Sequence, residues 1–187
     1  MYDVIIVGGG PAGGSAAIYT SKAGKKTLVL DNDKGVTRRA MLYNHYGVES
    51  ITGPDLIETG KKQAEKYGAE WVNETAAVIE SAGGVHTLKT AEGNTYEAKH
   101  VILATGYSID LAEASGLEVV PGTEPRVKNI IDVDAKGKTS KAGIWAAGTA
   151  AGVSVHTIIT AGDGAKVAIN VISEMNGERY VDHDVLK

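Results

Sequence analysis

The chain has 187 residues, of which 43% are hydrophobic and 22% charged, and its formal net charge is −4. This composition is typical of a folded globular domain, and the acidic balance argues against a nucleic-acid partner. No apolar run approaches the ~20 residues that span a bilayer, and the first residues show no targeting pattern, so we expect no membrane association and a cytoplasmic protein.

Cysteine is absent from the sequence. Its absence excludes disulfides, thiolate metal ligands and any reaction in which a thiol of these residues carries electrons. The five histidines show no metal-ligand spacing, so we expect no metal site.

The first 31 residues predict a strand, a glycine-rich turn, a helix and a second strand. The apolar run at 2–7 is typical of a buried parallel strand, and the small residues of 12–24 suit a helix packed closely on a sheet. A second apolar run, 26–30, ends at Asp31. This order predicts a βαβ unit.

Residues 31–51 are irregular, polar and aromatic, and their length indicates a binding loop. A helix is predicted over 52–70, because Pro54 suits its first turn and Gly68 its end. Three β-like runs separated by glycine turns then predict an antiparallel meander. The hydrophobic periodicity is lost after Gly106. It is followed by two short apolar runs and a predicted final helix. The ranges are 71–81, 85–93 and 95–105 for the meander, 129–134 and 143–148 for the short runs, and 155–175 for the helix.

Gly8, Gly10 and Gly13 form a G-x-G-x-x-G pattern between the first strand and its helix. The first glycine allows a tight turn, the second lets the backbone approach a pyrophosphate, and the third lets helix and strand pack closely. Asp31 follows Gly13 by 18 residues, at the strand end where an acid receives ribose hydroxyls. The pattern predicts a dinucleotide but does not distinguish NAD from FAD.

The order of the later motifs resembles the flavin half of the thioredoxin reductase family, from residue 2 to about 175. The similar segments are GGGPAG at 8–13, the predicted helix beginning ITGPDL at 51, ATG at 104–106, TSKAGIWAAG at 139–148 and HTIITAGDGAKVA at 156–168. The resemblance implies an FAD/NAD(P)-binding Rossmann-like α/β domain in three layers: a parallel sheet, helices and a three-stranded antiparallel meander. It also implies FAD as the cofactor.

The same resemblance implies the cofactor contacts. The pyrophosphate would meet Gly8, Gly9, Gly10, Pro11, Ala12 and Gly13, the ribose Asp31 and Asn32, and the adenine the backbone near Ala76. The middle of the cofactor would meet Ala104, Thr105 and Gly106, and the flavin Asn44, Gly148, Thr149, His156, Thr157 and Ile158. Arg38 and Arg39 lie in a loop similar to that of related dithiol oxidases, where they would either touch the cofactor or remain solvated.

Three departures from the family restrict the function. The 41 residues between Gly106 and Gly148 hold no second strand–glycine–helix unit, so we expect a single FAD-binding domain over 1–187, without an NADPH-binding domain between about 107 and 138. No C-x-x-C motif is present, which excludes dithiol–disulfide exchange as an intrinsic activity. Thr149 occupies the place of the family's aspartate, so we expect flavin binding to be weaker by roughly tenfold to a hundredfold, or altered, but not abolished.

His156, in the first turn of the final helix, has two interpretations: a fixed hydrogen-bond partner of the flavin, or a protonatable group that adjusts the flavin potential. No catalytic residue is identified. The sequence favours an FAD-dependent oxidoreductase that receives electrons from a partner protein or an external reductant. A flavin-carrying electron-transfer module and a non-enzymatic regulatory subunit are the alternatives, and the family favours a homodimer.

Overall fold

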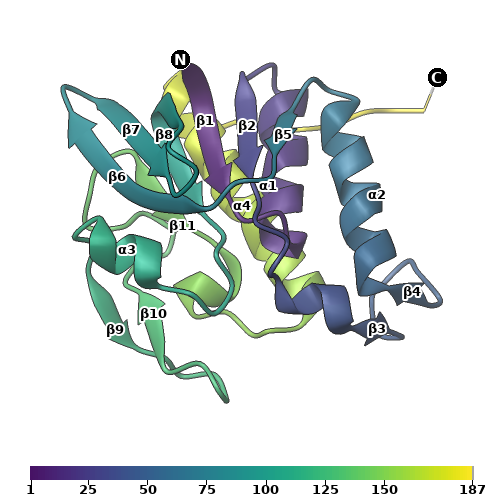
Figure 1. Ribbon diagram of the computed structural model, residues 1–187. Helices are drawn as coiled ribbons and strands as arrows, with labels where there is room; N and C mark the ends of the chain where they lie inside the picture. Colours follow the sequence, from purple (N-terminus) through teal and green to yellow (C-terminus); the bar gives the residue numbers. More distant parts are fainter. Residues whose placement is uncertain (187) are drawn as a thin grey trace.

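A seven-stranded sheet organises residues 1–186, the part of the chain that the computed structural model describes (Figure 1). The strand order is β5-β2-β1-β8-β7-β6, and β11 also pairs with β8. The strands are β1 (Tyr2–Val7), β2 (Thr27–Leu30), β5 (Glu70–Val72), β6 (Ala76–Ala82), β7 (Val85–Thr90), β8 (Thr95–Leu103) and β11 (Ile144–Ala146).

Strand β8 joins the parallel and antiparallel parts of this sheet. Along one edge it runs parallel to β1. Along the other edge its first half pairs antiparallel with β7, and its second half pairs parallel with β11. The parallel strands β1, β2, β8 and β11 therefore end on the same side of the sheet. Open α/β sheets bind ligands beyond these carboxyl ends.

Three helices cover one face of the sheet: α1 (Pro11–Lys22), α2 (Gly53–Glu65) and α4 (Thr157–Asn176). Val4 and Ile6 of β1 pack in this helix-side core, whereas Ile5 and Val7 pack in the core on the opposite face. Because residues 4–7 of β1 are buried on both faces, this part of the strand is a continuous apolar run. Within the described residues, no helix is long and apolar enough to cross a membrane.

In the core on the opposite face, Ile5 and Val7 cluster with side chains of the antiparallel part of the sheet, β6–β7–β8, and of α3 (Asp110–Ala114). The hairpin of β9 (Val119–Pro121) and β10 (Asn129–Ile131) follows α3 and forms a sheet of its own. Figure 1 shows this hairpin below α3. The three-layer α/β arrangement predicted from the sequence is thus confirmed. The remaining elements are η1 (Val36–Arg39), β3 (Met41–Leu42), β4 (Ile51–Thr52) and η2 (Gly148–Ala151).

The prediction of one strand over 71–81 is wrong. The segment divides into β5, which pairs with β2 at one edge of the sheet, and β6, which pairs with β7 at the opposite edge. The polar residues Asn73, Glu74 and Thr75 carry the chain between the two edges. The prediction of an irregular chain between Gly106 and residue 129 is also wrong in part. This stretch contains α3 and β9, which are too short for hydrophobic periodicity to reveal.

His100 and Trp145 form a hydrogen bond between β8 and β11. The buried Trp145 donates from Nε1 to Nδ1 of His100 at 3.2 Å, so this ring nitrogen must carry no proton. Burial lowers the pKa of His100, Glu174 opposes this effect, and His86, Lys138 and Lys99 reinforce it.

We expect His100→Gln to reduce the loss of stability in acid. Because the folded pKa of His100 lies below its unfolded value, the unfolded chain binds more protons, and stability falls as the pH drops from about 6.5 through the folded pKa. Urea unfolding at about pH 7.5 and about pH 5 should give a smaller difference for the variant than for wild type. Burial also lowers the pKa of His86, so the contribution of His86 to the loss of stability in acid should remain in the variant. An unchanged difference would contradict this assignment.

Two adjacent glycines of α1 provide a matched test of helix packing. A Cβ on Gly13 would lie 1.8 Å from the carbonyl oxygen of Gly8, whereas a Cβ on Gly14 would meet no atom within 4 Å. We expect Gly13→Ala to lower the free energy of unfolding by about 1–3 kcal/mol or more, and Gly14→Ala to raise it by about 0.5–1 kcal/mol. Urea denaturation measures both free energies of unfolding. Equal changes in the two variants would show that the close contact between Gly13 and Gly8 does not prevent a side chain at position 13.

Candidate functional site

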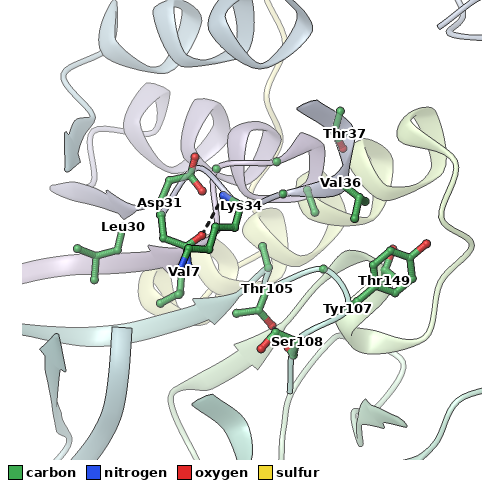
Figure 2. A pocket seen from close by; sticks show the side chains of 18 of the residues that line it. Val7, Leu30, Asp31, Lys34, Val36, Thr37, Thr105, Tyr107, Ser108 and Thr149 are labelled. Carbon is green, nitrogen blue, oxygen red and sulfur yellow. Dashed lines mark hydrogen bonds between the residues drawn. The ribbon is translucent and has the colours of Figure 1, made fainter. Parts of the chain in front are cut away.

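A cavity of about 510 Å³ opens at the carboxyl ends of the parallel strands (Figure 2). Its wall comes from the turn after β1, the segment after β2, the connection between β5 and β6, the segment after β8, and the chain around η2 and the start of α4. Figure 2 shows Asp31 and Lys34 on one side of the cavity and Tyr107 and Thr149 on the other. Its volume is in the range of cofactor sites.

The glycine turn forms the floor of the cavity by close backbone contacts. Gly8 has φ +104°, and a Cβ there would lie 2.3 Å from the carbonyl oxygen of Ala104. Gly10, by contrast, lines the cavity, and a Cβ on it would meet no protein atom within 4 Å. The turn therefore packs tightly on the protein side and leaves open space on the cavity side, which fits a bound pyrophosphate.

Asp31 lies at the end of β2 with its carboxylate largely buried. Its Oδ2 accepts a hydrogen bond from Nη2 of Arg38 at 3.2 Å and lies so close to Gly9 that a Cβ there would be 2.7 Å away. Within residues 1–186, Oδ1 accepts no hydrogen bond, and Asp31 lines the cavity. This oxygen is available to a hydroxyl of a bound ligand.

Thr149 lines the opposite end of the cavity, on η2. The segment is attached to α4 by Asp163, whose Oδ2 accepts a hydrogen bond from the Gly148 amide at 2.8 Å. The other oxygen of Asp163 pairs with Lys166 at 2.6 Å. Asp163 lies in a predicted helix with no sign of its partner, so the sequence did not single it out.

Glu74 fixes the wall between β5 and β6. Its Oε1 accepts hydrogen bonds from Asn94 and Tyr96, at 2.8 and 2.9 Å. Burial raises the pKa of Glu74, but hydrogen bonds from Tyr96, Thr90 and Asn94 outweigh burial and lower it. The carboxylate is therefore charged near neutral pH and anchors the wall to the meander.

More than half of the residues predicted to bind a cofactor line this cavity. They are Gly8, Gly9, Gly10, Pro11, Ala12, Asp31, Asn32, Ala76, Ala104, Thr105, Gly106 and Thr149. The others lie outside its lining, and their cofactor contacts stay predictions: Gly13, Arg38, Arg39, Asn44, Gly148, His156, Thr157 and Ile158. Among these, the exposed His156 precedes α4, with its Nδ1 2.8 Å from Oγ of Ser154.

Fifteen further residues line the cavity that the sequence did not single out, although Lys34, Gly35, Val36 and Thr37 lie in the predicted binding loop. The others are Val7, Leu30, Glu74, Thr75, Tyr107, Ser108, Asp110, Leu111, Ala147, Val155 and Thr160. Most lie in the connections that follow strands. The carboxyl-end position of those connections was the available signal, because ligands of α/β sheets bind there.

The family comparison matches most of the chain. The model of the pyridine nucleotide-disulphide oxidoreductases aligns with residues 2–124 and 49–165. The chain belongs to this family. Its membership confirms the resemblance found in the motifs, and it implies a flavin cofactor.

Similar curated proteins are thioredoxin reductases. That of Peptoclostridium litorale is 38% identical over 126 residues, which are 65% of this chain and 40% of that protein. The bifunctional thioredoxin reductase/thioredoxin of Mycobacterium leprae is 33% identical over 126 residues, 65% of this chain and 28% of that protein. The aligned part of the chain thus spans less than half the length of these relatives.

Solved structures confirm the Rossmann-like fold. The atypical thioredoxin reductase TRi from Desulfovibrio vulgaris Hildenborough superposes with a TM-score of 0.83 at 20% identity, covering 95% of this chain and 99% of that one. A thioredoxin reductase from Gloeobacter violaceus gives the same TM-score at 18% identity, with 99% of each chain covered.

The link between η2 and α4 can be tested with two substitutions of Asp163. We expect Asp163→Ala to lower the free energy of unfolding by about 1–3 kcal/mol, because the buried Gly148 amide loses its acceptor. Asp163→Asn keeps a side-chain oxygen and loses only the pair with the half-exposed Lys166, so it should cost at most about 1 kcal/mol. Urea unfolding distinguishes them. Equal losses would assign the effect to charge and not to the Gly148 amide.

Proposed function

We propose that the cavity binds FAD and that the chain is an FAD-dependent oxidoreductase of the thioredoxin reductase-like class. One observation carries this proposal: a single cavity is lined at one end by the glycine turn and Asp31 and at the other by Thr149. These residues belong to motifs more than 100 residues apart in the sequence. An extended dinucleotide would occupy both ends.

The residues of the chain would bind the cofactor as follows. The first amides of α1 would face the pyrophosphate, since helix N-termini favour anions. The free Oδ1 of Asp31 would accept a ribose hydroxyl, and the Thr149 hydroxyl would meet the ribityl chain. The start of α4 would favour negative charge on the flavin. When bound, FAD supplies hydride and single-electron chemistry.

We infer that the electrons come from a partner protein or an external reductant. Within the described residues, 107–143 hold only α3 and the β9–β10 hairpin, without a second βαβ unit. The absence of cysteine in this sequence leaves no thiol to pass electrons to a disulfide. A flavin-carrying electron-transfer module is the second candidate. It is compatible with Tyr107 and Val155, which line the cavity and are each 40% exposed, so that a partner can reach them.

The absorbance spectrum of the purified chain tests the proposal. We expect bound flavin, or its uptake on incubation with FAD, and bleaching by dithionite. Rapid oxidation of NADH or NADPH by the isolated chain would count against the electron-transfer module, which should leave both nucleotides unreacted. A colourless protein that cannot be loaded with FAD would contradict both.

Thr149→Asp should tighten FAD binding by roughly tenfold to a hundredfold, because a carboxylate forms a charge-assisted hydrogen bond with a ribityl hydroxyl. Equilibrium titration of flavin fluorescence gives the dissociation constant. Thr95→Asp, an exposed position at the start of β8 outside the cavity lining, adds the same charge and should leave the affinity unchanged. Equal affinities of wild type and Thr149→Asp would place Thr149 away from the cofactor.

A further inference from the structure

Two histidines lie against β11, the strand that leads into the wall of the cavity. Nδ1 of His100 accepts a hydrogen bond from the indole N–H of Trp145 at 3.2 Å. Nε2 of His86 lies so close to Gly143, the residue before β11, that a Cβ there would be 2.3 Å away. The two rings therefore contact the segment 143–145 from the neighbouring strands β8 and β7.

The hydrogen bond to Trp145 requires a neutral His100. Trp145 is only 1% exposed, and its indole has a single donor, for which His100 is the acceptor. A proton on Nδ1 would turn this nitrogen into a donor and leave the buried indole N–H without a partner. The two ring planes are inclined by 50° with their centroids 6.3 Å apart, so the rings do not stack. His100 is only partly buried, so a proton from solvent can reach it.

The charges around His100 determine the pH at which it takes up a proton. Burial lowers the pKa of His100, and Glu174 of α4 opposes burial. Three further groups act with burial and lower this pKa: His86 of β7, Lys138 before β11 and Lys99 of β8. Lys138 is also paired with Glu174, so the carboxylate that favours a proton on His100 is partly compensated.

The end of β11 continues directly into the wall of the cavity. Trp145 pairs with Ile102 in the parallel register of β11 and β8. Two residues later, the amide of Ala147 donates to the carbonyl oxygen of Leu103 at 2.9 Å. Ala147 and Thr149 line the cavity. A displacement of Trp145 therefore reaches the wall within two residues.

We propose that His100 is a pH-sensitive switch of this wall: the neutral ring holds Trp145 in place, and protonation releases it and shifts residues 147–149. The wall is fixed at neutral pH and released below about pH 6.5, because the pKa of His100 lies below its ordinary value. A ligand that needs the fixed wall binds more weakly in acid, and its binding in turn opposes protonation of His100. Only this consequence for FAD rests on the proposed function.

Nuclear magnetic resonance of the full, isotopically labelled chain between about pH 8 and about pH 5 tests the switch. The sequence has two tryptophans, and Trp71→Phe assigns their indole signals. In wild type we expect the indole signal of Trp145 and the amide signals of Ala147 and Thr149 to shift together, with one midpoint below about pH 6.5.

Two variants assign this transition to one histidine. His100→Gln should lose it, because the amide oxygen of glutamine accepts the indole N–H at every pH. His183→Gln removes an exposed histidine of the segment after α4 and should titrate like wild type. His86 is present in both variants, so its own titration does not distinguish them.

Fluorescence titration with FAD at about pH 7.5 and about pH 5.5 measures the consequence for binding. Between these values the affinity of wild type should fall by at least about fivefold more than that of His100→Gln. The comparison with the variant removes the contribution of other titratable groups, including His156 beside the cavity.

Four results would overturn the proposal: a Trp145 signal that is constant in wild type; the same transition in His100→Gln, which would assign it to His86; a Trp145 transition that Ala147 and Thr149 do not follow; or, in a chain that binds FAD, an equal loss of affinity in wild type and variant. A chain that takes up FAD but shows constant signals would retain the proposed function and lose this inference. A chain that shows the transition without binding FAD would do the reverse.

Discussion

The site depends on contact between backbones where α1 begins. A Cβ on Gly13 would collide with the carbonyl oxygen of Gly8, and a Cβ on Gly164 would lie 2.0 Å from that of Ala12. Only glycine permits these approaches, which bring the first turn of α1 against both the sheet and α4. The amides of α1 consequently point to the edge of the sheet where the parallel strands end, and the cavity forms there.

The packing of α1 on α4 also brings together the glycine turn and the segment around Gly148, which are distant in sequence. Gly148, with φ +72°, lies so close to Ala12 that a Cβ would be 2.8 Å from that side chain. Its buried amide needs an acceptor, and Asp163 provides it from α4. Thr149 is thereby held at the far end of the cavity. The orientation of η2, which carries Thr149, is thus a consequence of how α1 and α4 cross.

The sequence predicted the parts of the fold that local patterns encode. The apolar run of β1, the glycine turn and Asp31 lie within one βαβ unit, where spacing and position suffice. The split of 71–81 into two strands at opposite edges was not predictable in this way, because hydrophobicity does not specify a strand's partner. Asp163 was missed for a related reason: its acceptor role depends on a contact 15 residues away.

The two ends of the cavity differ in how charge is arranged. At the end lined by the glycine turn, Arg38 pairs with Asp31 and with the half-exposed Asp33, so the charge of the Asp31 carboxylate is compensated within the protein. At the other end, Thr149 offers an uncharged hydroxyl, and Val155, which also lines the cavity, is exposed. If FAD binds as proposed, its nucleotide half meets the charged Asp31 and its flavin half the neutral Thr149. A flavin held in this way would be fixed at its non-reacting end, with its reacting end accessible to whatever molecule exchanges electrons with it.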